Sequence, residues 1–166
     1  MLTFSAFDLV HILTILILLY LAYVDLLTFR LPDVITIPFA AVGLLLNYLP
    51  NLGFTDFLNA ILGSIFGYFL IWGLNTLYRW IKKQNAIGMG DAKLLGALGA
   101  WLGLSSLPSI LFIASVTGLI GGLLWLKVKK QSLQSAIPFG PFLAIAGIIE
   151  LLCPQFIQTL ILNHLI

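Results

Sequence analysis

The stretch NAIGMGDAKLLGALG, residues 85–99, decides how the rest of the chain is interpreted. It places two glycines and one carboxylate, Asp91, directly before a run of small apolar residues that predicts a helix. A glycine turn followed by a capped helix N-terminus explains this pattern without any chemistry. The same pattern also suits half of an active site, and the surrounding sequence has to separate the two interpretations.

The composition indicates a membrane protein. The chain has 166 residues, of which 61% are hydrophobic and 8% charged, and its mean hydropathy is +1.12. Because a soluble domain is usually about 25% charged, we predict a polytopic membrane protein whose residues 1–166 form a single domain. The lone Cys153 excludes an internal disulfide and a multi-cysteine zinc site. We expect no metal and no cofactor.

The apolar segments predict an all-α bundle of about six transmembrane helices. A spanning helix needs roughly 17–25 mostly apolar residues. The approximate expected spans are 9–27, 34–49, 57–78, 92–105, 108–126 and 141–162. The fourth is short and rich in Gly and Ala, which predicts a helix packed among others. The small-xxx-small pair Gly63 and Gly67, and the glycines at 96, 99 and 103, are interpreted as helix-packing residues. Pro154 predicts a kink or break in the sixth, with residues 155–166 as an alternative interfacial segment.

The basic residues predict the orientation of the bundle. Six spans place all eight Lys and Arg residues in loops on one side. Because Lys and Arg favour the cytoplasmic side, we expect both termini on the non-cytoplasmic side. These residues are interpreted as topology signals and lipid-headgroup anchors. The net charge of +2 therefore does not indicate nucleic acid as a partner.

Most of the acidic residues have a structural interpretation. Asp8, Asp33 and Asp56 lie where predicted helices begin, and each is expected to act as an N-cap. Glu150 lies late in the sixth predicted span. We expect it to extend toward the outer surface or to bind a polar partner.

Asp25 and Asp91 are the candidate catalytic residues. The predicted topology places both at the cytoplasmic ends of their helices, and an ionisable residue within a membrane span is functional by default. Two carboxylates at one depth can activate water for attack on an amide, as in aspartic proteases. Asp91 begins a helix and Asp25 lies near a helix end. Helix dipoles therefore suggest Asp91 as the base and Asp25 as the acid.

Three further residues are candidates for shaping this site. Gly88 and Gly90 carry no side chain beside Asp91, which leaves room for a substrate backbone or for a positive φ angle. Tyr23 lies two positions before Asp25 and is expected either to line the site or to act as an interfacial or packing aromatic.

Three blocks resemble the signature segments of the type IV prepilin peptidases, which are GxGD-type membrane aspartyl proteases. The blocks are YVDLLTFRLPDVITIPFAAVGLLLN (23–47), GMGDAKLLGALGAWLG (88–103) and IPFGPFLAIAG (137–147). The resemblance implies that Asp25 and Asp91 are catalytic. It also implies cleavage of the short basic leader of prepilins or pseudopilins at the cytoplasmic face of the bacterial inner membrane.

Two parts of these blocks have open interpretations. Lys93 matches a lysine of the family block; it would orient substrate, bias the charges of the aspartates or serve as a lipid anchor. The IPFGPF segment, residues 137–142, is either a turn into the sixth span or a border of the substrate site.

The chain resembles a short form of this family. Full-length members carry an N-terminal cytoplasmic region, often with a four-cysteine zinc site, that is associated with N-methylation. The resemblance therefore supports the peptidase and not the methyltransferase. An inactive assembly factor for pili or type II secretion is one alternative. A small proton-coupled transporter is another, but its two acids would lie on one face only, and no inverted repeat is evident.

Overall fold

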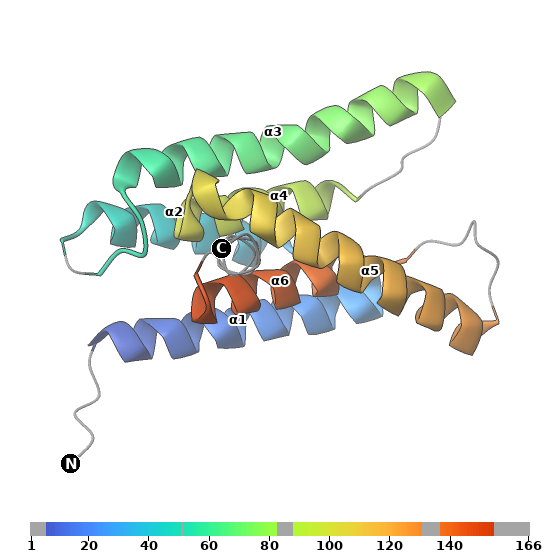
Figure 1. Ribbon diagram of the computed structural model, residues 1–166, viewed down its shortest axis with the longest axis horizontal. Helices are drawn as coiled ribbons and strands as arrows, with labels where there is room; N and C mark the ends of the chain where they lie inside the picture. Colours follow the sequence, from blue (N-terminus) through green and yellow to red (C-terminus); the bar gives the residue numbers. More distant parts are fainter. Residues whose placement is uncertain (1–5, 51, 83–87, 131–136, 155–166) are drawn as a thin grey trace, which may run out of the picture.

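The described part of the structure is a bundle of helices. The computed structural model describes residues 6–50, 52–82, 88–130 and 137–154. Within these ranges the chain forms six α-helices, one short 3-10 helix and no strand (Figure 1): α1 (Ala6–Thr28), α2 (Asp33–Tyr48), α3 (Phe57–Lys82), α4 (Met89–Leu102), η1 (Leu104–Ser106), α5 (Leu107–Lys129) and α6 (Gly140–Leu152). The predicted all-α class is confirmed.

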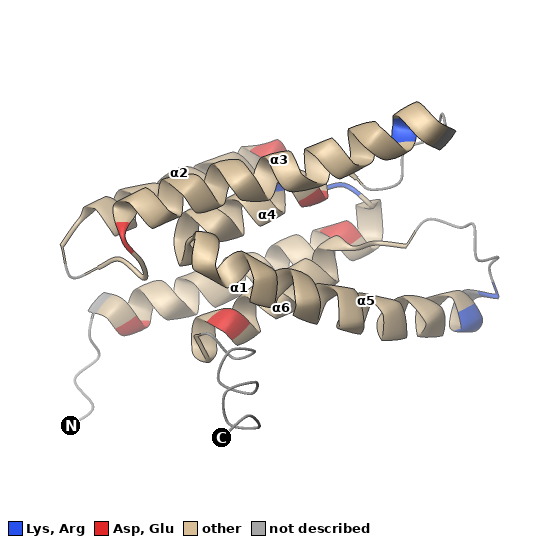
Figure 2. Cartoon of the chain, turned by 45° about the horizontal axis from the view of Figure 1, so that its top comes forward, with Lys and Arg blue, Asp and Glu red and all other residues tan. Residues whose placement is uncertain are grey.

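Basic residues gather at one end of the bundle. Arg30 follows the end of α1, and Arg79 lies near the end of α3. Lys93 lies near the start of α4, whereas Lys127 and Lys130 lie at the end of α5. Figure 2 shows the segments coloured blue for Lys and Arg toward the end at which α3 and α5 finish. This is the arrangement that the charge pattern predicts for a cytoplasmic end.

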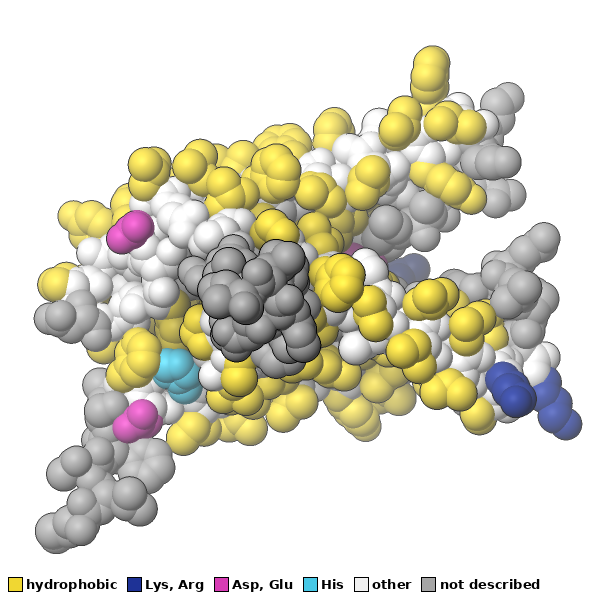
Figure 3. Space-filling model, in the orientation of Figure 1, with side chains coloured by type: hydrophobic (Ala, Val, Ile, Leu, Met, Phe, Trp, Pro, Cys, Tyr) yellow, Lys and Arg dark blue, Asp and Glu magenta, His cyan; other side chains and the backbone are white. Residues whose placement is uncertain are grey.

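The helices differ in their ability to cross a membrane. Three are long and apolar enough, over Phe7–Thr28, Phe57–Ile81 and Leu104–Val128, whereas α2 and α6 are shorter apolar helices. Hydrophobic side chains cover much of the face seen in Figure 3. α6 ends at Leu152, before Pro154, and the remainder of the predicted sixth span lies outside the described residues. The number of spans stays a prediction.

α4 is the central helix, and it positions Asp91. It packs against α2, α3 and α6. Every residue from Leu94 to Leu102 is buried, which confirms the interpretation of a helix packed among others. α4 begins at Met89, three residues before the predicted start, because Gly88 already takes the N-cap position. Asp91 therefore lies inside the first turn of the helix.

Glycines bring α3 and α4 into close contact. A Cβ at Gly63 would lie 2.6 Å from the carbonyl oxygen of Gly99, and a Cβ at Gly67 would lie 2.7 Å from that of Leu95. Small residues of this kind allow two membrane helices to approach backbone to backbone. The prediction that these glycines serve helix packing is confirmed, and the contact holds α4 in place.

Asn47 forms hydrogen bonds with the C-terminal end of α4. Its Nδ2 donates to the carbonyl oxygens of Ala100 at 2.8 Å and Trp101 at 3.0 Å. Its Oδ1 accepts from the backbone amides of Phe54 at 2.7 Å and Thr55 at 3.0 Å. One buried amide thus uses all of its hydrogen-bonding capacity, and it joins the ends of α2 and α4 to the loop before α3.

Two of the three expected N-cap residues, Asp8 and Asp33, lie inside their helices instead. Pro32 takes the N-cap position of α2, and Asp33 is the first helical residue. Asp8 lies inside the first turn of α1. Asp56 directly precedes α3, as expected. Glu150 is only 1% exposed, so the expectation that it extends to the outer surface is wrong.

Candidate active site

Asp25 and Asp91 line the same pocket. Asp25 comes from the last turns of α1 and is 5% exposed, and Asp91 comes from the first turn of α4 and is 6% exposed. The pocket that both side chains line has a volume of about 250 Å³. The structure therefore brings together the two carboxyl groups that the sequence places at one depth.

The start of α6 also contacts the side chain of Asp25. The backbone N–H of Gly140 donates to Asp25 Oδ2 at 3.1 Å. A Cβ at Gly140 would lie only 2.6 Å from the same oxygen, so no larger residue fits here without displacing the carboxyl group. Gly140 was not among the predicted site residues. The signal that pointed to it was the IPFGPF segment, which thus contacts Asp25.

This contact changes the interpretation of the two charges. Asp91 lies at the N-terminus of α4, and Asp25 meets the N-terminus of α6. Because the positive ends of helix dipoles face both carboxyl groups, the dipoles alone do not assign an acid and a base. The expected assignment considered only the helix that carries each residue.

The two glycines beside Asp91 have different roles. The carbonyl oxygen of Gly88 accepts from the backbone N–H of Asp91 at 3.1 Å, and Gly88 is exposed at the pocket. A Cβ at Gly90 would lie 3.0 Å from the Cβ of Leu31. Because Gly90 has no side chain, Leu31, in the segment between α1 and α2, can pack against the turn that carries Asp91. The sequence did not predict this intramolecular contact.

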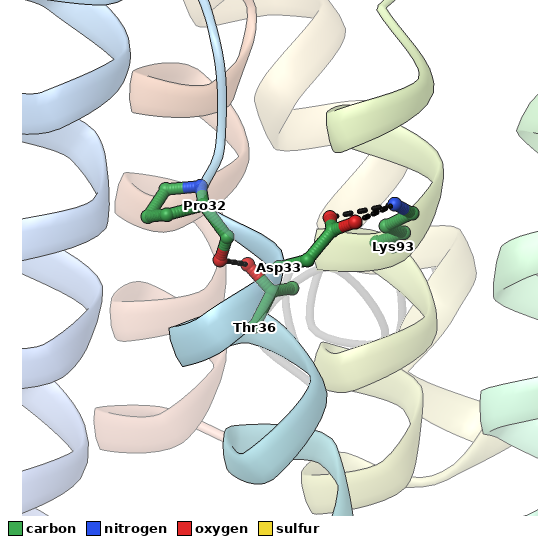
Figure 4. Close-up of polar contacts among 4 residues, drawn as sticks. All are labelled: Pro32, Asp33, Thr36 and Lys93. Atoms are coloured by element: carbon green, nitrogen blue, oxygen red, sulfur yellow. Dashed lines mark hydrogen bonds and ion pairs between the residues drawn. The ribbon is translucent and has the colours of Figure 1, made fainter.

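Lys93 forms an ion pair with Asp33 at the edge of the pocket. Lys93 Nζ lies 2.6 Å from both carboxylate oxygens of Asp33, and the side chains are 29% and 55% exposed, respectively. Figure 4 shows the pair joining α4 to the start of α2, where Thr36 Oγ1 donates to the carbonyl oxygen of Pro32 at 3.0 Å. None of the roles expected for Lys93 included an ion pair with Asp33.

Tyr23 lies apart from the pocket, and Phe29 lines it instead. Tyr23 is 60% exposed, since two residues of a helix turn its side chain about 200° away from that of Asp25. Phe29 follows α1 with φ 54°, and its N–H donates to the carbonyl oxygen of Asp25 at 2.9 Å. A left-handed Phe at this position fixes the end of α1 beside the catalytic candidate, and no sequence pattern indicated it.

Asn75 is a second residue that the sequence did not single out. It lies in α3, is 4% exposed, and its Nδ2 lies 3.7 Å from the sulfur of Met89. Met89 stands between the two glycines of the GMGD turn. This polar contact links α3 to the turn that carries Asp91. The sequence did not single out Asn75 because it lies within an apolar segment.

The chemistry available in the pocket is that of paired carboxyl groups. Two such groups can share a proton and activate water for attack on an amide. Arg30 and the ion-paired Lys93 also line the pocket. Among the described residues, no group of three or more His, Cys, Asp or Glu side chains is placed to hold a metal ion.

A comparison with protein families matches residues 12–123 to the type IV leader peptidase family. The chain belongs to this family. The match confirms the resemblance of the blocks at 23–47 and 88–103, whereas the block at 137–147 lies beyond the matched range. The matched range includes both candidate aspartates of this leader peptidase family member.

Curated relatives agree with this assignment. The prepilin leader peptidase/N-methyltransferase of Dickeya chrysanthemi is 42% identical over 127 residues, which cover 76% of this chain and 44% of the relative. The proteins of the same name from Aeromonas hydrophila and Pseudomonas aeruginosa are 40% and 38% identical and cover 82% and 74% of this chain. The matches span less than half of the length of these relatives. No solved structure matches the chain.

Proposed function

We propose that this chain is a membrane aspartic endopeptidase that cleaves the leader peptide of type IV prepilins or pseudopilins. The observation that carries the proposal is the single pocket lined by two buried aspartates from α1 and α4. The names of the relatives support prepilins as the substrates. Methylation is not part of the proposal, since the chain matches less than half of the length of proteins named for both activities.

The mechanism uses the two carboxyl groups as one catalytic unit. The ionised carboxylate takes a proton from water as the water oxygen attacks the scissile carbonyl carbon. The protonated carboxyl group gives its proton to the carbonyl oxygen, which forms a tetrahedral diol. As the diol collapses, the first carboxyl group gives the proton taken from water to the leaving nitrogen, and the second takes a proton from a diol hydroxyl, which restores both groups. Because the groups interact, they titrate as a pair. The backbone amide of Gly140 holds Asp25 in position, and the first turn of α4 positions Asp91.

The proposal places the site at the cytoplasmic face of the bacterial inner membrane. Six spans, with both termini on the opposite side, form a single peptidase domain over residues 1–166. The gathering of basic residues at the end of the bundle that carries Asp25 and Asp91 supports this orientation. Water reaches this end directly, and the reaction needs no path across the bilayer, unlike that of a transporter.

The test is cleavage of a prepilin by the purified chain in lipid. Asp25→Asn and Asp91→Asn keep the side-chain shape and remove the ionisable group, and each is expected to lower the rate by about 100- to 10,000-fold. Asp56→Asn is the matched control, because Asp56 is an exposed carboxylate that precedes α3 at the other end of the bundle.

Two results would contradict the proposal. Cleavage by Asp25→Asn or Asp91→Asn at the wild-type rate would remove that residue from the mechanism. A folded wild-type chain that cleaves no prepilin or pseudopilin, yet supports pilus or secretion assembly, would show an assembly factor.

A further inference from the structure

A second cavity lies between α1 and α2, and we call it the α1–α2 groove. α1 packs on α6 whereas α2 packs on α4, which leaves a groove of about 480 Å³ between them. Its walls are almost entirely apolar, and they include Val10, Leu13 and Ile17 of α1, Pro38 and Val42 of α2, and Trp101 of α4. The Thr14 hydroxyl, which also lines the groove, donates to the Val10 carbonyl oxygen at 2.8 Å.

The groove leads toward the candidate active site. Thr14 precedes Asp25 by about three helical turns and therefore lies on the same face of α1. On the other wall, Val34 lines the groove and its neighbour Asp33 lines the pocket of the two aspartates. The pocket and the groove therefore adjoin at the start of α2.

A backbone acceptor near this junction favours a polypeptide as the occupant. Pro38 lies inside α2 and has no N–H, so it cannot donate to the carbonyl oxygen of Val34 one turn earlier. Both residues line the groove, and Val34 is 84% exposed. A lipid acyl chain offers no donor to such a carbonyl group, whereas the extended backbone of a peptide at a protease site does.

We propose that the α1–α2 groove binds the hydrophobic segment of the substrate that follows the scissile bond. This inference rests on the proposed peptidase function, and it names the surface of this chain that selects the substrate. An apolar groove beside lipid suits an apolar helix, and the adjoining pocket takes the polar peptide to be cleaved. The charged leader then lies on the far side of the pocket, outside the groove.

The geometry also sets the register of the substrate. Ile17 and Val10 lie about 12 and 22 Å from Asp25 along α1 at 1.5 Å per residue. If the first four residues after the scissile bond are extended, they cover about 13 Å. The fifth residue then lies at the near end of the groove, and a fully helical segment reaches the far end at about its fifteenth residue.

Disulfide cross-linking tests this placement. The protein carries Cys153→Ser to remove its own thiol and Asp91→Asn to keep the substrate uncut. A single cysteine is then introduced as Leu13→Cys or Val42→Cys, within the groove, and a single cysteine is moved along the prepilin. Leu19→Cys is the matched control, because Leu19 is 50% exposed, against 49% for Leu13, but faces away from the groove.

The expected result is cross-linking from both groove positions to residues about 5 to 15 after the scissile bond. Excess prepilin without cysteine should suppress the cross-links, and Leu19→Cys should form few. Equal cross-linking from Leu19→Cys would overturn the proposal, as would an absence of cross-links from the groove, which is the result expected if lipid fills it.

Kinetics separate this inference from the proposed function. Leu13→Trp fills the groove and should lower kcat/KM for full-length prepilin by about tenfold or more, whereas Leu19→Trp should leave it close to wild type. Equal kcat/KM values for the two variants would refute binding of the substrate in the groove, but they would not contradict the proposed peptidase function. If the wild type cleaves nothing, the peptidase proposal fails, and the cross-links still report whether the groove binds the segment.

Discussion

Substitution of Gly140 by Ala tests how the catalytic geometry is held. The new Cβ would lie 2.6 Å from Asp25 Oδ2, whereas an ordinary contact begins at 3.4 Å. The backbone at Gly140 does not have a positive φ, so alanine adds no backbone strain there. The carboxyl group of Asp25 must therefore move by about 0.8 Å, and its 3.1 Å hydrogen bond from the Gly140 amide must change.

This displacement gives an expected magnitude. A misplacement of about 1 Å in a catalytic group lowers a rate by about 100-fold, which corresponds to about 2.7 kcal/mol of transition-state stabilisation. Extra methyl groups in a packed site reduce the free energy of unfolding by about 1–3 kcal/mol. We therefore expect Gly140→Ala to fold and to lose most of its kcat.

The assay is the initial rate of prepilin processing in proteoliposomes, with the folded fraction measured in parallel. Gly147→Ala is the control within α6, because its Cβ would meet the flexible end of Leu98 at 2.5 Å. Gly73→Ala is a second control with no atom within 4 Å of the new Cβ. If folded Gly140→Ala processes prepilin within about threefold of the rate of Gly147→Ala, the Gly140 contact does not hold the catalytic carboxyl group.

Three further substitutions test the surrounding structure. Asn47→Ala leaves four backbone groups without their partner and should reduce the free energy of unfolding by about 2–4 kcal/mol; an unchanged denaturant midpoint would contradict this. Lys93→Met breaks an exposed ion pair and should change that free energy by less than about 1 kcal/mol, and exchanging the charges of Lys93 and Asp33 should restore any loss. Gly99→Ala drives a Cβ into the Gly63 backbone and should reduce stability by about 3 kcal/mol, measured by thermal unfolding in detergent.

Much of the helical arrangement follows from local sequence. Apolar runs predicted each of the six helices, because burial in lipid or in the bundle favours continuous apolar segments. The pairing of Asp25 with Asp91 followed from charge and topology, since loops rich in Lys and Arg share one side. Gly63 and Gly99 were recognised as packing residues because their spacing places small residues on one helix face.

The finer geometry depends on contacts between distant segments. The Gly140 amide meets Asp25 only once α6 packs on α1, and periodicity within either helix carries no information about that contact. Asn47 likewise bonds residues more than fifty positions away. The expected cap at Asp33 was wrong because Pro32 already ends the extended segment, which leaves the Asp33 side chain available to Lys93.

The lengths of the helices bear on the membrane around the site. α2, α4 and α6 have 16, 14 and 13 residues, whereas α1, α3 and α5 have 23, 26 and 23. At 1.5 Å per residue the shorter set is about 20–24 Å long, against a hydrocarbon thickness of about 30 Å. Asp33, Asp91 and Gly140 all lie in the first turns of this shorter set.

A bilayer relieves such a mismatch by thinning locally. In the proposed orientation, such thinning would place the aspartates at the bottom of a depression in the lipid surface, where water replaces acyl chains beside the site. Under the proposed function, longer acyl chains would oppose the depression, restrict the supply of water to the two carboxyl groups and lower the rate of cleavage.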